Sequence, residues 1–120
     1  MRLLILILLV SNLTNAQVKD DISVVQFSAE FVKTNEISLI PFRDYNTETL
    51  YLSKNQKAFQ KENITSLPTI ILYNDGKEIV KIEGGISLKL PEDTTETINK
   101  HINIILESRL SYDIINGKYK

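Results

Sequence analysis

The stretch "NITSLPTIILYNDGKEIVKIEGG", residues 63–85, carries the strongest structural signals in the chain. Its segment "TIILY" (69–73) is rich in β-branched and aromatic residues, which favour a buried strand. Residues 74–76 read Asn-Asp-Gly, a typical hairpin turn, and "EIVKIEG" (78–84) follows closely. We therefore expect an antiparallel hairpin whose second strand ends at a pair of glycines.

Pro68 directly precedes the first of these strands. Proline has no N–H to donate within a sheet and is normally excluded from interior strands, although it is tolerated as a first residue. Two conformations are open to it: a trans bond at the start of the strand, or a cis bond that turns the backbone sharply. The residues of the hairpin by themselves do not decide between them.

Composition is that of one folded domain without thiol chemistry. The chain has 120 residues, of which 42% are hydrophobic and 24% charged, so we expect a single core. The formal net charge is -1 and the basic residues are scattered, which argues against a nucleic-acid partner. There is no cysteine, which excludes disulfides, thiolate metal sites and thiol nucleophiles.

The first sixteen residues, "MRLLILILLVSNLTNA", have the pattern of a secretory signal. Arg2 precedes an apolar run over 3–10, and a polar segment with small residues ends at Ala16. The run is far shorter than the ~20 residues that a membrane-spanning helix needs. We predict cleavage after Ala16, secretion or delivery to the lumen of the secretory pathway, and no membrane association afterwards.

The mature chain is expected to form one domain over 17–110, followed by a flexible tail over 111–120. "SVVQF" (23–27) and "TLYL" (49–52) are typical of strands. After the second of them we expect a short helix that ends near residue 62. Its start is predicted by a capping box, formed by the serine at 53 and the glutamine at 56.

The last helix is predicted over 94–110, with a capping box from Asp93 and Glu96 at its start. Its apolar residues recur at helical spacing and predict one face packed on the sheet: Ile98, Ile102, Ile105 and Leu106. The segment 29–47 is ambiguous. Either it contains a short helix interrupted at Pro41, which we favour, or "EISLIPF" (36–42) is a strand.

This order of elements resembles the thioredoxin fold, and 63–85 resembles the second half of a thioredoxin domain most closely. The resemblance implies an α/β fold with a central mixed sheet flanked by helices, here with a shortened middle segment. It also implies that Pro68 is cis and that Leu67 presents its peptide groups to a partner.

"SVVQFSAEFVKTNE" (23–36) resembles the thioredoxin stretch in which a buried strand leads into W-A-E-W-C-x-x-C. In that alignment the two cysteines fall on Val32 and Asn35, and the buried strand carboxylate of the family falls on Gln26. Thiol–disulfide exchange needs a thiolate, which neither valine nor asparagine supplies. We therefore expect a redox-inactive chain, and no enzyme.

The sequence has few signals for metal, cofactor or phosphate sites. His101 is the only histidine, and a metal site needs several ligands, so we predict neither metal nor cofactor. No glycine-rich phosphate loop is present. Asn63-Ile64-Thr65 is an N-glycosylation sequon, which makes Asn63 a glycosylation candidate in a secreted chain.

The resemblance implies one function that needs no cysteine, the binding of a protein or an extended peptide segment. The groove beside the proline would be formed by Leu67 and Pro68 on one side and by Phe31 and Val32 on the other. Two alternatives remain open: a disulfide oxidoreductase or isomerase-related role by resemblance only, and a decayed copy without activity. It is also open whether the shortened middle segment simply buries Phe31 and Val32.

Overall fold

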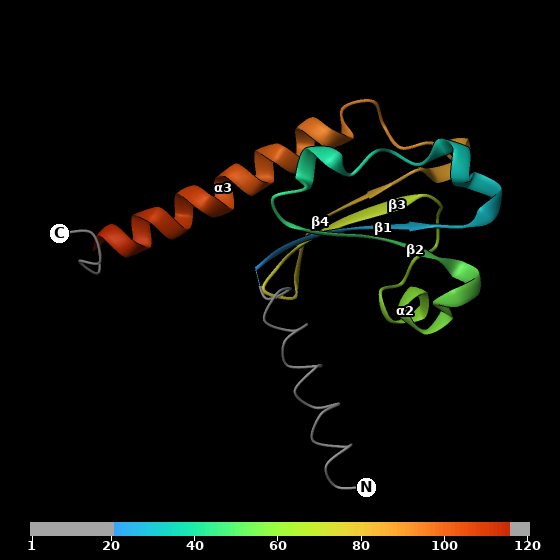
Figure 1. Cartoon of the computed structure of the whole chain (residues 1–120), viewed down its shortest axis with the longest axis horizontal. Helices are drawn as coiled ribbons and strands as arrows, with labels where there is room; N and C mark the ends of the chain where they lie inside the picture. The colour runs from blue at the N-terminus through green and yellow to red at the C-terminus, as the bar shows by residue number, and fades with distance from the viewer. Residues whose placement is uncertain (1–20, 116–120) are drawn as a thin grey trace, which may run out of the picture.

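Four strands form one mixed sheet in the computed structural model, which describes residues 21–115 (Figure 1). The strand order is β2-β1-β3-β4, and the bounds are β1 Ile22–Ser28, β2 Asn46–Tyr51, β3 Thr69–Asn74 and β4 Lys77–Glu83. β1 and β2 run parallel, while β1–β3 and β3–β4 are antiparallel. The predicted mixed sheet is confirmed.

The predicted hairpin of β3 and β4 is confirmed together with its turn. Asp75 and Gly76 have φ angles of 52° and 79°, the left-handed values that a tight hairpin turn requires at both central positions. The Leu67–Pro68 bond is cis, as the resemblance implied. At the other end of the hairpin, a Cβ on Gly84 would lie 3.0 Å from the Pro68 carbonyl oxygen, so the close approach of the two segments favours glycine.

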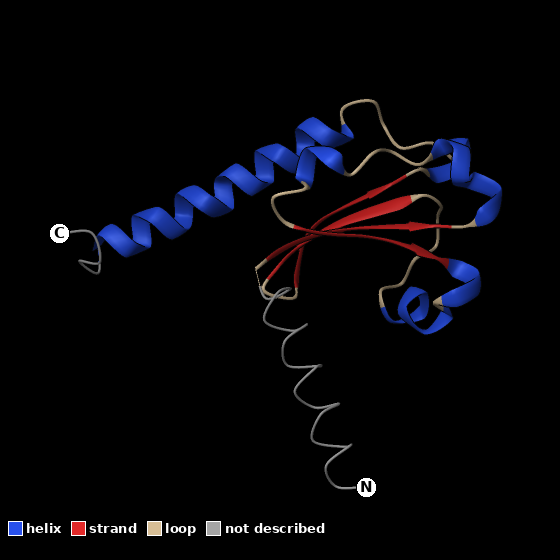
Figure 2. Ribbon diagram, viewed as in Figure 1, coloured by secondary structure: helices blue, strands red, loops and turns tan. Residues whose placement is uncertain are grey.

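Helices cover the two faces of the sheet unequally (Figure 2). The long α3 (Thr94–Ile115) covers one face, whose core residues are Ile22, Val24, Phe42, Ile70, Leu72, Leu90, Ile98, Ile102 and Ile105. The short α2 (Gln56–Lys61) packs on the other face, where the Phe59 ring meets Phe27 edge-on with centroids 5.1 Å apart. Ile71 completes this smaller cluster.

The crossover between β1 and β2 contains neither the favoured helix nor the alternative strand. Two 3-10 turns, η1 (Glu30–Asn35) and η2 (Ile40–Phe42), are joined by irregular backbone. Phe42 is fully buried against the first core cluster, so burial of one aromatic ring fixes this segment. Pro41 lies in the first turn of η2, where a missing N–H costs nothing.

Three further expectations need correction. A capping box at α2 is wrong, because the helix begins at Gln56 after Asn55 and no side chain caps it. The last helix does not end at 110 but continues through Ile115, so the first part of the predicted tail is helical. Leu106, expected on the packed face, is 39% exposed, because α3 leaves the sheet there. Residues 116–120 and the predicted signal lie outside the described residues.

No helix within residues 21–115 has both the length and the apolar character needed to span a membrane.

Candidate functional site

The candidate site lies where η1 follows β1 and where the Leu67–Pro68 segment enters β3. A shallow cavity of about 420 Å³ opens there, lined by Phe31, Thr65, Ser66, Leu67, Gly85, Ile86 and Leu88. The structure thus brings together two of the four predicted groove residues, Phe31 and Leu67, in the lining of one cavity. Pro68 is buried behind the groove.

Val32 does not line the groove as predicted. Its side chain is only 1% exposed, whereas the neighbouring Phe31 is 70% exposed. Successive side chains of a 3-10 turn point in different directions, so η1 turns one residue toward the sheet and the next toward solvent. The sequence left open whether Phe31 and Val32 line the groove or are buried. The structure buries Val32 and exposes Phe31.

The segment before β3 is held by its serine and leaves the next residue unpaired. Ser66 Oγ accepts a hydrogen bond from the Gly85 N–H at 2.7 Å, and the Ser66 carbonyl accepts one from Thr69 Oγ1 at 2.7 Å. Within residues 21–115, the N–H and C=O of Leu67 make no hydrogen bond. A donor and an acceptor at a groove edge can pair with the backbone of an extended peptide.

Gln26, which the resemblance aligned with the family's buried carboxylate, is 1% exposed and uses both ends of its amide. Its Oε1 accepts a hydrogen bond from the Ile37 N–H at 2.9 Å, and its Nε2 donates to the Ile37 carbonyl at 3.0 Å. Nε2 also lies 3.4 Å from Thr49 Oγ1 on β2. The side chain therefore ties the segment after η1 to the sheet.

Glu36 joins the carboxyl ends of β1 and β2. Its two carboxylate oxygens accept hydrogen bonds from Ser28 Oγ at 2.8 Å and from the Tyr51 hydroxyl at 3.2 Å. The hydrogen bond to Glu36, followed by desolvation, raises the pKa of Tyr51 above its usual value. The Lys33 ammonium lies 5.9 Å from the centroid of the Tyr51 ring, within the range of a cation–π contact.

Asn35, expected from the resemblance at the second cysteine position, connects η1 to Leu88, another residue that lines the groove. Its Nδ2 donates a hydrogen bond to the Leu88 carbonyl at 2.8 Å. Leu88 has a φ of 58°, a left-handed conformation that is unfavourable for a leucine and persists only where neighbours hold it. The asparagine thus supports the lip of the groove.

These groups offer no evident route to covalent chemistry. A carboxylate 2.8 Å from a serine hydroxyl could act as a base, but Ser28 is fully buried and out of reach of a substrate. Within residues 21–115 no three acidic or histidine side chains gather as metal ligands would. His101 is placed on α3, where its Nδ1 lies 2.8 Å from the Thr97 carbonyl.

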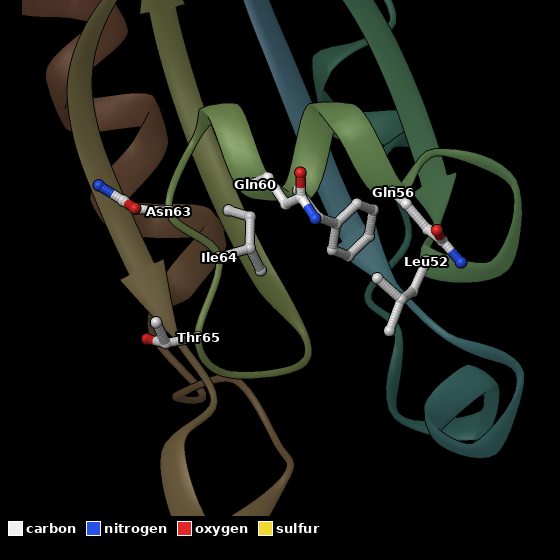
Figure 3. A pocket seen from close by; sticks show the side chains of 7 residues that line it. Leu52, Gln56, Gln60, Asn63, Ile64 and Thr65 are labelled. Carbon is white, nitrogen blue, oxygen red and sulfur yellow. The ribbon is translucent and has the colours of Figure 1, made fainter.

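A second cavity, of about 480 Å³, lies beside α2 and is lined by Leu52, Gln56, Phe59, Gln60, Asn63, Ile64 and Thr65 (Figure 3). Figure 3 shows the Asn63 side chain pointing away from Ile64 and Gln60. The loop that carries Asn63 is fixed by Lys81, whose Nζ donates to the Glu62 and Asn63 carbonyls at 3.0 Å each. The cavity has a polar glutamine rim without a charged group.

Sequence reasoning missed Ser66, Ile86, Leu88 and Glu36. Ile86 follows two glycines in a segment without periodicity, so its complete exposure had no sequence signal. Glu36 contacts residues eight and fifteen positions away, which local patterns do not indicate. Ser66 accepts its side-chain hydrogen bond from Gly85, nineteen positions away, which local patterns do not indicate either.

No family model matches the chain. The thioredoxin of Chlamydia pneumoniae is 38% identical over 50 residues, which are 42% of this chain and 46% of that protein. The match thus spans about half the length of this curated relative.

Solved structures share the fold at low sequence identity. Fasciola hepatica thioredoxin matches with a TM-score of 0.56 and 23% identity, over 77% of this chain and 90% of that one. The oxidised thioredoxin of Plasmodium falciparum matches with a TM-score of 0.54 and 18% identity, over 75% and 90% of the two chains. The domain has a thioredoxin-like fold, and without cysteine it has no CxxC pair and is redox-inactive.

Gln26→Glu should make stability depend on pH. Burial and the nearby Ile37 carbonyl both disfavour a carboxylate, so the folded-state pKa of the new side chain should lie above its ordinary value of about 4.3. A side chain whose pKa is higher in the folded state than in the unfolded state stabilises the fold fully at pH values below its unfolded-state pKa. This contribution is lost as the pH rises through the folded-state pKa. Near pH 7 we expect a loss of about 2–4 kcal/mol in unfolding free energy relative to the unsubstituted chain.

That loss should shrink toward about pH 4, because a protonated carboxyl can donate to the Ile37 carbonyl again. Urea unfolding of both chains at a series of pH values measures it. Gln26→Leu, which cannot ionise, is the control and should be destabilised equally at every pH. A deficit of Gln26→Glu that did not change with pH would contradict the role given to the amide.

The double substitution Val32→Cys and Asn35→Cys should form a disulfide under mild oxidation. Side chains three positions apart lie nearly one above the other in a 3-10 turn, which brings the two sulfur atoms within bonding range. Mass spectrometry should find two fewer hydrogens, with no reactive thiol left. Val32→Cys with Thr34→Cys is the matched control and should remain reduced; equal oxidation of both pairs would speak against the alignment.

Proposed function

We propose that this chain is an exported, redox-inactive binding module that holds an extended peptide segment in the groove beside Leu67 and Pro68. The observation that carries the proposal is that exposed apolar side chains and backbone groups without hydrogen-bond partners line the same cavity. Phe31 is 70% exposed and Ile86 is fully exposed, and the N–H and C=O of Leu67 in the same cavity lining lack partners within residues 21–115.

The two features suit one kind of ligand. Backbone groups at the groove edge bind a peptide main chain of any sequence, and apolar walls select for a large apolar side chain. Exposed aromatic and aliphatic side chains around a cavity are unfavourable in water unless a partner covers them. The two hydrogen bonds of Ser66 and the one from Asn35 hold the walls in place before a ligand arrives, which lowers the entropic cost of binding.

Export is the second part of the proposal and rests on the sequence of residues 1–16. If the host compartment carries out N-glycosylation, Asn63 is the acceptor that the fold leaves accessible. It is exposed, and its side chain makes no hydrogen bond within residues 21–115.

Ile86→Asp should weaken peptide binding at least about tenfold, a change of about 1.4 kcal/mol, by placing a charge in the apolar wall. The ligand is a short linear peptide selected from a displayed random library on the unsubstituted domain, and fluorescence anisotropy measures its affinity. Stability should change by less than about 0.5 kcal/mol, since Ile86 is fully exposed.

Ile40→Asp is the matched control for this measurement. Ile40, like Ile86, is an exposed isoleucine within a 3-10 turn, but it does not line the groove, so its variant should bind as the unsubstituted domain does. If no peptide is selected, or if Ile86→Asp binds peptide with unchanged affinity, the groove is not a peptide site. The result would then favour the alternative hypothesis of a decayed copy without activity.

Mass spectrometry of the chain recovered outside the producing cells should find Gln17, or its cyclised form, at the amino terminus. The apolar run over 3–10 is too short to anchor the chain, so a signal peptidase should remove it after Ala16. A product that retains Met1 would refute export by this route without affecting the groove.

A further inference from the structure

The groove and the cavity beside α2 share one residue of their lining. Thr65 lines both of them, and we call the second one the α2 cavity. The chain runs directly from Asn63 and Ile64 in the α2 cavity to Ser66 and Leu67 in the groove. Ile64 and Leu67 are three positions apart, so at most about 11 Å separates their Cα atoms. One short extended ligand is therefore long enough to contact both cavities.

The α2 cavity combines apolar residues with an uncharged polar rim. Its apolar residues are Leu52, Phe59 and Ile64. Gln56 and Gln60 lie four positions apart on α2, so their amides lie on one side of the helix, at the rim (Figure 3). An amide both donates and accepts hydrogen bonds. The cavity therefore suits a side chain with an apolar body and an uncharged polar tip, such as tyrosine, whereas a charged side chain would lose water there without gaining an ion pair.

Positive charge lies beside this rim. Lys57 and Lys61 each follow a rim glutamine on α2, both are exposed, and neither makes an ion pair within residues 21–115. Residues 52–65 contain three lysines but only one acid, Glu62, which accepts a hydrogen bond from the Tyr73 hydroxyl. A carboxylate on a ligand would therefore be attracted to the α2 end of the site, whereas the groove lining contains no charged residue.

We propose, on the basis of the peptide binding proposed above, that the α2 cavity is a second subsite for the same extended segment. The ligand has a large apolar side chain in the groove, an uncharged amphipathic side chain in the α2 cavity, and an acidic residue next to the second of these anchors. The two anchors are no more than about four residues apart, because an extended peptide rises about 3.3 Å per residue.

The first test is the sequence of the ligands. Eight-residue peptides from a displayed random library, selected on the unsubstituted domain, should share two large uncharged side chains no more than about four residues apart, with an acidic residue next to one of them. Alanine at either anchor position of a selected peptide should weaken binding at least about tenfold, as measured by fluorescence anisotropy. Selected peptides with a single anchor, or without an acidic residue, would overturn the proposal.

Protein variants then assign each anchor to its cavity. Leu52→Asp should weaken binding of a selected peptide at least about tenfold, and it should remove most of the effect of alanine at the anchor next to the acidic residue. Ile86→Asp should do the same for the other anchor. Ile79→Asp is the matched control, because Ile79 is 38% and Leu52 37% exposed but Ile79 lines neither cavity. Its variant should bind as the unsubstituted domain does.

Gln60→Glu is a second variant that preserves the size of the side chain. Gln60 is exposed, so the fold should not change. The added negative charge at the rim should weaken binding of the acidic peptide about threefold, and this loss should shrink when the salt concentration is raised.

The outcomes separate the second subsite from the groove itself. A selected peptide whose affinity falls with Ile86→Asp but not with Leu52→Asp or Gln60→Glu would overturn the second subsite and leave the groove as proposed. Equal losses from Leu52→Asp and Ile79→Asp would overturn it as well. A peptide whose affinity does not depend on Ile86 would refute the groove, and with it the second subsite.

Discussion

The Gln26 amide is the constraint on which the rest of the domain depends. Parallel pairing of β1 with β2 needs a crossover, and here that crossover contains 3-10 turns and irregular backbone instead of a regular helix. Irregular backbone near a core must find partners for its N–H and C=O groups. Gln26 supplies both partners for Ile37, which only a group that donates and accepts at once can do. A carboxylate at this position could satisfy only one of them.

The positions that the resemblance aligns with a redox centre act as structural supports in this domain. With Ile37 fixed, η1 turns Val32 into the core and Phe31 to the surface, and Glu36 reaches Ser28 and Tyr51. Asn35, where the resemblance implied a cysteine position, holds the backbone of the facing loop.

The sequence predicted what local signals determine and missed what distant contacts determine. The hairpin and the inward face of the last helix follow from turn residues and from apolar spacing, and both are found. The prediction of a helix in the crossover was wrong because the burial of Phe42 and the hydrogen bonds between Gln26 and Ile37 decide the path of that segment. Periodicity could place Leu106 near the apolar face of a helix, but it carries no information on where the sheet beneath that helix ends.

The groove and the contact that fixes the last helix lie at opposite ends of β1. The groove follows the last residue of that strand, Ser28, whereas Arg109 fixes α3 beside Asp21, just before its first. Seven residues of strand separate the two places by about 20 Å. At that separation substitutions usually act additively on stability, so the contacts that hold the groove can change without loosening the helix.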